Sequence, residues 1–284
     1  MNFAEFDSNA TPEEKGQLDV KIVETRDEDE KIPGIKKCVV QPGEHHCIMR
    51  DPDLNESIAY TIFMSTPISK HIPKLFGIQN KQVIVEDINY NFKTPCIVDF
   101  KVGVKTYDID EKDDIKKEKQ TIDDSTTTSR YFVRLSMAVK SKNGKIESKW
   151  NSDSGDVNLN ESNLRKMVQQ YCDDEDVRTK IAEQLTTLKE AYEDTLIEYP
   201  NMRMYNASIL ICYDGDDKKQ TPRCVFSKLG QSHLDIEDEG FSTDPENDDE
   251  FRNGIINLIK YFSPSVGEKA ETTVGTTSKC CLLV

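Results

Sequence analysis

Residues 95–103 read Pro-Cys-Ile-Val-Asp-Phe-Lys-Val-Gly and place two opposite charges inside an otherwise apolar run. Asp99 and Lys101 are two residues apart, so in an extended strand both side chains point to the same face. An exposed surface ion pair is one interpretation, because such pairs are common and contribute little stability. The apolar flanks favour another: a strand covered on both faces, with the two charges in a cleft between packed layers.

The composition is typical of a globular chain with sizeable polar segments. A length of 284 residues suffices for one large domain or two lobes, and 36% hydrophobic against 31% charged residues leaves room for polar loops. The net charge of −15 predicts no nucleic-acid partner, because an acidic chain is not drawn to phosphate backbones. Without a signal peptide or a long apolar run, we expect the chain in the cytoplasm or nucleus.

Strand and helix patterns alternate along the chain in a way that favours an α+β fold over a parallel α/β sheet. The apolar positions Leu54, Ile58 and Ile62 have helical spacing, with Asp53 as the expected N-cap, and residues 141–158 are expected to form a polar loop. The expected elements are strands at 47–50, 83–85, 95–108, 130–140, 205–213 and 223–229 and helices at 53–63, 164–171, 177–196 and 255–262.

The segment 108–124 between two of these strands is crowded with charge of both signs. One interpretation is a helix that turns lysines toward a cleft, among them Lys112, Lys116, Lys117 and Lys119. The other is a solvated helix on which acidic and basic side chains alternate. The sequence favours neither interpretation over the other.

Two motifs resemble signatures of the inositol polyphosphate kinase family. Residues 95–103 are similar to P-x-x-x-D-x-K-x-G, and residues 203–215 are similar to R-F-Y-S-S-S-L-L-x-x-Y-D-G, in wording closest to the inositol hexakisphosphate kinase branch. The resemblance extends over residues 40–262. It implies a two-lobed kinase-like fold, with an antiparallel sheet and a helical insert in the larger C-terminal lobe. The expected divisions are a polar N-terminal segment 1–36, a small nucleotide-binding lobe 37–92, a larger lobe 93–263 and a flexible tail 264–284.

The resemblance implies transfer of the γ-phosphoryl group of ATP to a hydroxyl of an inositol phosphate, chemistry that depends on positioned cations. In this family Asp99 would contact the nucleotide ribose, and Lys101 would grip the substrate and the transferred phosphate. Further residues follow by position in the motifs. They are Arg50 on the nucleotide phosphates in place of a lysine, Glu56 orienting it, Glu86 and Asp87 at the hinge that meets adenine, and Lys105 toward the substrate. If the 108–124 helix faces the cleft, Lys116 is also expected to bind the substrate.

One position departs from the family pattern. The family has an I-D-F segment whose Asp binds the metal on ATP, and the matching residue here is Lys228. An ammonium cannot ligate Mg²⁺, so the use of Mg²⁺ stays open. Lys228 is either a surrogate cation at the phosphates or the mark of a catalytically degraded pseudokinase that binds nucleotide or inositol phosphate as a scaffold or sensor. A shifted alignment would give Asp235 the metal role instead.

The last four residues, from Cys281 to Val284, have the pattern of a prenylation site, with Cys280 as a second lipidation position. Lipidation there would allow peripheral contact with a membrane. A second lipidated cysteine would matter, because a single lipid anchors only marginally and a second signal is needed. Chance occurrence of the tetrapeptide is the alternative interpretation.

Overall fold

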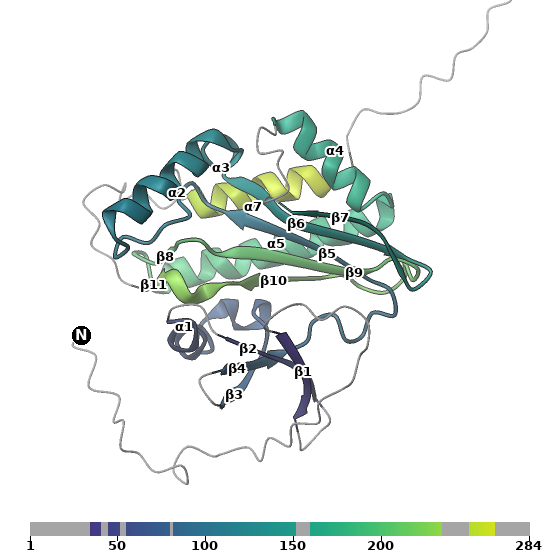
Figure 1. Cartoon of the computed structure of the whole chain (residues 1–284), viewed down its shortest axis with the longest axis horizontal. Coiled ribbons are helices and arrows are strands. Elements are labelled where there is room, and N and C mark those ends of the chain that lie inside the picture. Colours follow the sequence, from purple (N-terminus) through teal and green to yellow (C-terminus); the bar gives the residue numbers. More distant parts are fainter. Residues whose placement is uncertain are drawn as a thin grey trace, which may run out of the picture.

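The computed structural model describes residues 35–40, 45–51, 55–79, 82–151, 160–234 and 250–264. They form two main antiparallel sheets, a smaller one in purple at the bottom of Figure 1 and a larger one in teal and green across its middle, and a two-stranded antiparallel sheet of residues 203–204 and 232–233. None of the helices within these ranges has the length and apolar character that crossing a bilayer requires. Several predictions fall outside the described residues: the segment 1–34, the Asp53 cap, Asp235, and the lipidation sites Cys280 and Cys281.

The smaller lobe is a four-stranded sheet in the order β1-β2-β4-β3 with one α-helix and the 3-10 helix Pro67–His71 beside it. The predicted strands at 47–50 and 83–85 are confirmed, whereas β1 and β3 were not predicted. Strand β1 begins two residues before the predicted lobe boundary at 37. The bounds are β1 Ile35–Val40, β2 His45–Arg50, α1 Glu56–Phe63, β3 Leu75–Gln79 and β4 Gln82–Glu86.

Helix α1 is present as predicted, but the predicted apolar stripe is wrong. Ile58 is 57% exposed, whereas Tyr60 and Phe63 are fully buried in the main core. The helix starts at Glu56, after Asn55 in the left-handed conformation at φ 58°. With this start, the large aromatic rings face inward, because they remove more apolar surface from water than Ile58 would.

The larger lobe is a five-stranded sheet in the order β10-β9-β5-β6-β7, with β5 in the centre. Three helices, α4, α5 and α7, pack on one face, which we call the back face, and Val98, Phe100 and Val102 of β5 bury their side chains there. The bounds are β5 Pro95–Val102, α2 Asp113–Ser125, α3 Thr128–Tyr131, β6 Val133–Lys142, β7 Lys145–Asn151, α4 Glu161–Tyr171, α5 Glu175–Glu198, β8 Arg203–Met204, β9 Ser208–Asp214, β10 Arg223–Ser227, β11 Ser232–His233 and α7 Glu250–Phe262.

Two predicted strands have different limits. Strand β5 ends at Val102 instead of 108, because Gly103 adopts φ 97° and its N–H donates to the carbonyl of Phe132 at 2.9 Å. The strand predicted from 130 begins at Val133, because residues 128–131 form the short helix α3, which ends at Phe132 in the left-handed conformation. Local backbone geometry of this kind is not visible in strand propensity.

The hairpin predicted at 205–213 and 223–229 is confirmed with shorter strands, and the loop predicted at 141–158 is wrong in part. Strand β9 begins at Ser208 and β10 ends at Ser227. Residues 145–151 form β7, which pairs with β6 at the edge of the sheet. This strand is largely exposed and mixes charged with apolar residues, so it lacks the buried apolar pattern by which a strand is recognised in a sequence.

The carboxylate of Asp214 fixes the entry of β5. It accepts hydrogen bonds from the backbone N–H groups of Lys93 at 2.6 Å, Thr94 at 3.2 Å, Asp216 at 2.8 Å and Asp217 at 2.9 Å. Burial would raise the pKa of Asp214, but these four donors hold it below its ordinary value. The β9–β10 turn and the start of β5 are therefore held together by one side chain.

Gly254 lets α7 approach the sheet closely, and we predict that Gly254→Ala destabilises the protein. An added Cβ would lie 2.5 Å from the carbonyl oxygen of Phe132 and 2.6 Å from Cγ1 of Val102. Alanine gains about 1 kcal/mol of helix propensity, but overpacking costs about 1–3 kcal/mol. Urea unfolding should show a lower midpoint than wild type. Lys260→Ala on the exposed side of α7 should leave the midpoint nearly unchanged, and an unchanged midpoint in Gly254→Ala would contradict the prediction.

Candidate active site

A row of polar side chains crosses four strands of the larger sheet. Cross-strand pairing aligns Arg134 of β6 with Lys101 of β5, Lys101 with Ser208 of β9, and Ser208 with Ser227 of β10. Directly paired residues share a face, and this is the face opposite the helices, which we call the front face. These four residues, the polar row, lie in one line because the register of three strand pairs places them there.

Asp99 lies on the front face of β5 and forms an ion pair with Lys228. The Nζ atom of Lys228 is 3.1 Å from Oδ2 of Asp99, and the Asp99 residue is only 6% exposed. The other oxygen, Oδ1, is buried and accepts no hydrogen bond from the described residues. Lys228 follows β10 directly and adopts the left-handed conformation at φ 57° and ψ 51°. The sequence placed Lys228 only at the metal-ligand position of the motif, and the structure shows that it contacts Asp99 directly.

Lys101 is 7% exposed and donates from Nζ to the backbone carbonyl oxygen of Asn206. Asn206 adopts φ 51°, a left-handed conformation in the short link between β8 and β9. A buried ammonium requires such an acceptor, because an ammonium buried without one is strongly destabilising. Beside it, the hydroxyl oxygen of Ser208 is buried and forms no hydrogen bond with the described residues.

Arg50 and Glu56 form a two-point ion pair in the smaller lobe. Nη1 of Arg50 donates to Oε2 of Glu56 at 2.7 Å, and Nη2 donates to Oε1 at 2.5 Å. Glu56 is fully buried in the first turn of α1, while the Arg50 side chain is 20% exposed at the end of β2. The predicted pairing of a β2 cation with an α1 carboxylate is thus present in the structure, with the guanidinium held in a fixed plane.

Of the two predicted hinge residues, Glu86 links the two lobes through its side chain. The carboxylate of Glu86 accepts two hydrogen bonds from the guanidinium of Arg223 at the start of β10. Burial would raise the pKa of Glu86, but the Arg223 hydrogen bond and charge hold it below its ordinary value. The Asp87 N–H donates to the carbonyl of His46 at 3.0 Å, and its side chain accepts from the N–H of Asn89 at 3.0 Å. Both hinge carboxylates therefore serve the structure of the hinge.

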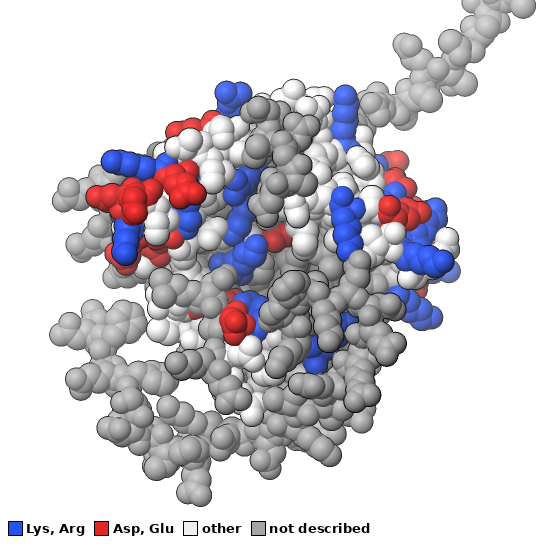
Figure 2. All heavy atoms as spheres, in the orientation of Figure 1, with Lys and Arg blue, Asp and Glu red and all other residues white. Residues whose placement is uncertain are grey.

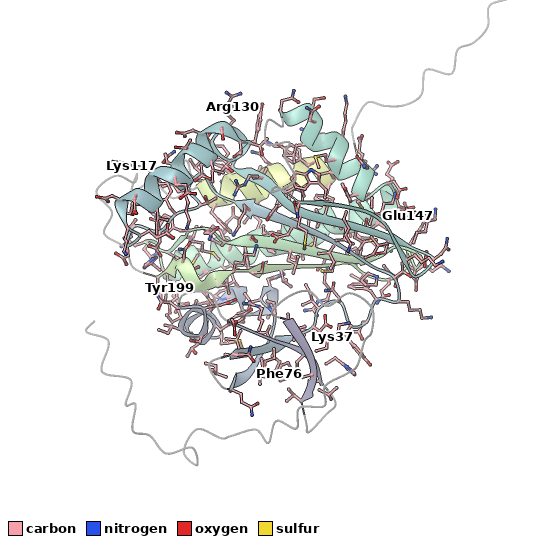
Figure 3. All side chains as sticks on the ribbon, viewed as in Figure 1. Lys37, Phe76, Lys117, Arg130, Glu147 and Tyr199 are labelled. Carbon is pink, nitrogen blue, oxygen red and sulfur yellow. The ribbon has the colours of Figure 1, made fainter. Side chains whose placement is uncertain are left out.

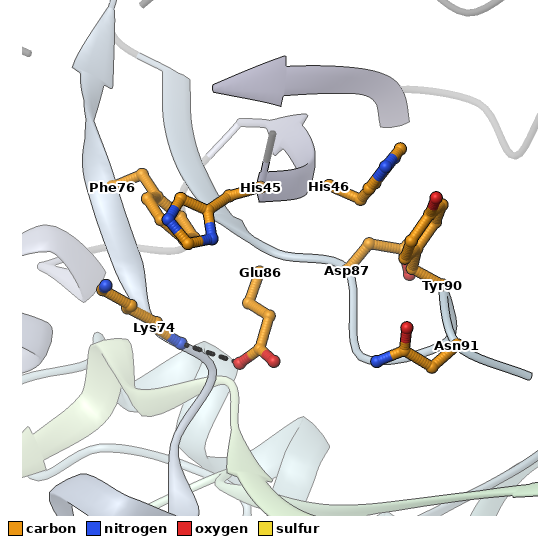
Figure 4. Close-up of a pocket in the computed structure, with 8 residues that line it drawn as sticks. All are labelled: His45, His46, Lys74, Phe76, Glu86, Asp87, Tyr90 and Asn91. Atoms are coloured by element: carbon orange, nitrogen blue, oxygen red, sulfur yellow. Dashed lines mark hydrogen bonds between the residues drawn. The ribbon is translucent and has the colours of Figure 1, made fainter. Parts of the chain in front are cut away.

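A cavity of about 290 Å³ lies at the hinge edge of the smaller sheet (Figure 4). The rings of His46 and Tyr90 stack on one side of it at 3.2 Å between centroids. His45 and Phe76 lie on the other side, with Glu86 between the two pairs (Figure 4). Because strand residues alternate, His46 shares the face of β2 that carries Arg50, whereas His45 points to the opposite face. The cavity therefore draws its lining from both faces at this end of the sheet. Its lining residues are His45, His46, Lys74, Phe76, Glu86, Asp87, Tyr90 and Asn91.

The front face changes character along the strands. Near the hinge, Ile88 and Phe92 pack against Cys212 of β9 and Val225 of β10, with Ile97 and Leu210 partly buried beside them. Further along the same strands come Asp99, Lys101 and Ser208. One end of this face is therefore apolar, with Ile97 and Leu210 partly exposed beside a buried cluster, and the other end carries charged and polar groups.

The lysines of the 108–124 segment are used mainly within that segment. Lys116 donates to the carbonyl of Ile109, and Lys119 pairs with Glu111 at 2.5 Å. Lys117 points outward from α2, away from the sheet (Figure 3). Basic side chains instead form a strip down the middle of the face seen in Figure 2, while acidic ones gather around α2 at its left. This arrangement favours the solvated-helix interpretation for most of α2.

Asp123, the one buried residue of α2, ties this helix to the loop after β5. Its carboxylate accepts from the N–H and from the hydroxyl of Thr106, both at 2.8 Å. Burial raises the pKa of Asp123 above its ordinary value, while the two Thr106 hydrogen bonds and, to a smaller degree, nearby Arg134 oppose this rise. Lys105 precedes Thr106, so the Asp123 contact also fixes the position of the backbone that carries Lys105.

The structure holds a second cluster of titratable groups at β11. Asp108, Asp110 and His233 each offer one atom within 4.8 Å of the others. Nε2 of His233 already lies 2.9 Å and 3.0 Å from the two oxygens of Asp108, and the Asp110 N–H donates to Asp108 at 3.1 Å. These contacts explain the cluster as an ion pair that fastens β11 to the loop after β5.

A divalent cation does not fit beside Asp99 with the described residues. No group of three His, Cys, Asp or Glu side chains is found there, and among the described ranges only Asp108, Asp110 and His233 form one. The carboxylate of Asp99 is already bonded to the ammonium of Lys228. Mg²⁺ and Mn²⁺ prefer oxygen ligands and are repelled by an adjacent ammonium.

The structure adds residues to the site that the sequence analysis missed. Arg134 stands in the polar row, and the carbonyl of Asn206 holds Lys101. A signal for Arg134 existed, because a single charge between Val133 and Leu135 repeats the pattern that singled out Asp99. The Asn206 carbonyl carried no such signal, because a backbone acceptor looks the same in every residue.

Comparison with known proteins agrees with the predicted resemblance. A family model described as inositol polyphosphate kinase matches residues 82–263. Among solved structures, inositol phosphate multikinase Ipk2 from S. cerevisiae in complex with ADP and Mn²⁺ is similar with a TM-score of 0.62 and 16% identity, covering 75% of this chain and 96% of that chain. A second structure, from structural studies and protein engineering of inositol phosphate multikinase, gives 0.56 and 18%, covering 73% and 97%. No curated protein sequence matches. The likeness in structure confirms the two-lobed fold.

The His233–Asp108 pair predicts a stability that depends on pH. The hydrogen bond to Asp108 raises the pKa of His233 above its ordinary value of 6.5. Burial would raise the pKa of Asp108, but the hydrogen bonds from His233 and from the Asp110 N–H hold that pKa below its ordinary value of 3.8. The contribution of His233 to the free energy of unfolding is complete below about pH 6.5 and is lost as the pH rises through the raised pKa of His233. The contribution of Asp108 is present above about pH 3.8 and is lost as the pH falls through the lowered pKa of Asp108.

We therefore expect His233→Asn to lower the melting temperature more at about pH 6 than at about pH 9. Thermal unfolding of both proteins across this range measures the difference. Asp108→Asn should reduce the same pH dependence, since it removes the other member of the pair. Equal losses at both pH values in His233→Asn would show that the pair does not carry the effect.

Proposed function

Because the chain belongs to the inositol polyphosphate kinase family, we propose that it transfers the γ-phosphoryl group of ATP to a hydroxyl of an inositol phosphate. The observation that carries the proposal is the buried Lys101 in the polar row, beside Asp99 on the front face. Phosphoryl transfer depends mainly on positioning and on stabilisation of the charge that spreads over the transferred group. A buried, oriented ammonium is suited to that task.

The nucleotide is proposed to lie along the front face from the hinge toward the polar row. The partly buried Ile97 and Leu210 at the apolar end suit a flat base, which gains by leaving water. Arg50, held in plane by Glu56, suits the phosphates, because a guanidinium binds phosphate oxygens at two points. The similar Ipk2 structure contains ADP and Mn²⁺, which supports nucleotide use by this fold.

The acceptor is proposed to be held by cations that follow the polar row. Lys101 and Arg134 are paired directly across β5 and β6, and Lys105 lies on the loop that Asp123 fastens through Thr106. The chain carries a net charge of −15, so its overall field repels a polyanion. Binding of an inositol phosphate therefore depends on this local cluster, which a partly desolvated cleft screens less than bulk solvent would. The proposal also includes a contact between Lys116 and the bound inositol phosphate.

A divalent ion, when bound to a nucleotide, supplies charge neutralisation and a template for the phosphates. Since such an ion does not fit at Asp99, we assign the neutralisation at this point to side chains of the chain itself. Lys101 would face the transferred group, Arg50 would bind the nucleotide phosphates, and Lys228 would add a third positive charge beside Asp99.

A second candidate function is favoured by the Lys228 ion pair alone. In a catalytically degraded pseudokinase, the same cleft would bind nucleotide or inositol phosphate without turnover, and the chain would act as a scaffold or sensor. Lys228 removes a metal ligand from the site, and removal of one charge-stabilising group in an active site lowers turnover by about 10²–10³-fold. The two candidates share the ligands and differ in whether product forms.

We predict that the purified protein forms a new phosphorylated species from Mg·ATP and at least one member of a panel of inositol phosphates. Lys101→Met should reduce product by about 10²-fold or more, because it removes a buried cation from the transferred group. Lys117→Met is the matched control: Lys117 is exposed on α2 and points away from the sheet (Figure 3), so product should be unchanged.

Ion-exchange separation of the reaction products, with radiolabelled γ-phosphate, makes the measurement. Full activity in Lys101→Met would contradict the assignment of Lys101 as the cation at the transferred group. No product from any acceptor, with ATP or an inositol phosphate still bound by the folded protein, would establish the pseudokinase.

A further inference from the structure

We propose that the ammonium of Lys228 takes the place of a divalent cation beside Asp99, so that this chain binds the polyphosphate of a nucleotide without requiring a divalent metal ion. The proposal rests on the function proposed above, since it concerns how the same cleft holds its nucleotide.

The position of Lys228 is fixed by the sheet. Ser227, the last residue of β10, is paired with Ser208, and Ser208 is paired with Lys101. Lys228 comes next and turns out of the strand in the left-handed conformation, which brings its side chain to Asp99. Two ammonium groups, those of Lys101 and Lys228, therefore reach the front face from positions two strands apart at the same level of the sheet.

The carboxylate of Asp99 is not available as a metal ligand in this arrangement. One oxygen binds the Lys228 ammonium at 3.1 Å, and the other is buried without a hydrogen bond from the described residues. A divalent ion at this carboxylate would have to displace the ammonium and then remain close to two positive side chains. The Asp108, Asp110 and His233 cluster does not supply a metal here, because Asp108 is bonded through both oxygens to His233.

The Lys228 side chain is both anchored and accessible. Its side chain is 38% exposed while that of Asp99 is 8% exposed, so the ammonium connects a buried carboxylate with solvent. An ammonium has three donors, and one is used by Asp99. The others can bind phosphate oxygens from the cleft side, in the place where a metal ion would bridge a carboxylate and a phosphate. Arg50 and Lys101 provide further positive charge for the metal-free polyphosphate.

Isothermal titration calorimetry with ATP, in excess EDTA and in excess Mg²⁺, tests the proposal directly as binding. For the wild-type protein we expect the two dissociation constants to agree within about threefold. Lys228→Asn removes the ammonium and accepts the left-handed backbone. It should weaken binding in EDTA by about tenfold or more, the loss that corresponds to a charged hydrogen bond.

Lys228→Asp should weaken binding in EDTA further and gain at least about tenfold in affinity when Mg²⁺ is added, because it creates an oxygen ligand beside Asp99. Lys117→Asp is the matched control: it makes the same change in net charge on the exposed side of α2 and should behave as wild type. Lys228→Arg keeps a cation in the cleft and should keep metal-free binding. Thermal unfolding confirms that each variant is folded.

The outcomes separate this proposal from the proposed function. Wild-type binding that is lost in EDTA and restored by Mg²⁺ would overturn the role of Lys228 while leaving the nucleotide site intact. Unchanged affinity of Lys228→Asn in EDTA would overturn it as well. A folded wild-type protein that binds ATP in neither buffer would overturn nucleotide use itself, and the metal-free site with it.

Discussion

The structure depends on a central strand that is covered on both faces while carrying two charges on one of them. Strand β5 packs Val98, Phe100 and Val102 against the helices of the back face, so its register cannot slip without exposing them. That register forces Asp99 and Lys101 onto the front face, where each needs a partner. Lys228 and the Asn206 carbonyl are those partners, and both come from segments with left-handed backbone at the ends of neighbouring strands.

The same register sets the electrostatics of the site. An acidic chain holds its cations for a polyanion in one line across the larger sheet, instead of spreading them over the surface. The polar row contains two of these cations, and Lys228 extends it beyond β10. A carbonyl keeps Lys101 in place and a carboxylate keeps Lys228 in place, which limits the side-chain entropy that a bound anion would cost. Arg50 follows the same rule in the other lobe, through Glu56.

Elements with strong periodicity were predictable, and elements defined by their neighbours were not. Helices α4 and α5 have apolar stripes at helical spacing, and both were predicted and observed. Strand β7 has no buried apolar pattern, because it is an edge strand that gains its stability from pairing with β6. The buried face of α1 was misjudged, since the spacing of isoleucines does not reveal which side meets the core. Contacts of Tyr60 and Phe63 in the core determine which face of α1 is buried.

The sequence by itself determined that β5 would be a buried strand with Asp99 and Lys101 on one face, because alternation along a strand follows from backbone geometry alone. It also determined the pairing of a β2 cation with an α1 carboxylate, through the family resemblance of the two segments. Only the tertiary structure decided that Lys228 bonds Asp99 and that Arg134 lies in line with Lys101. Those contacts join residues 129 and 33 positions apart along the chain, and only strand register and a left-handed turn bring them together.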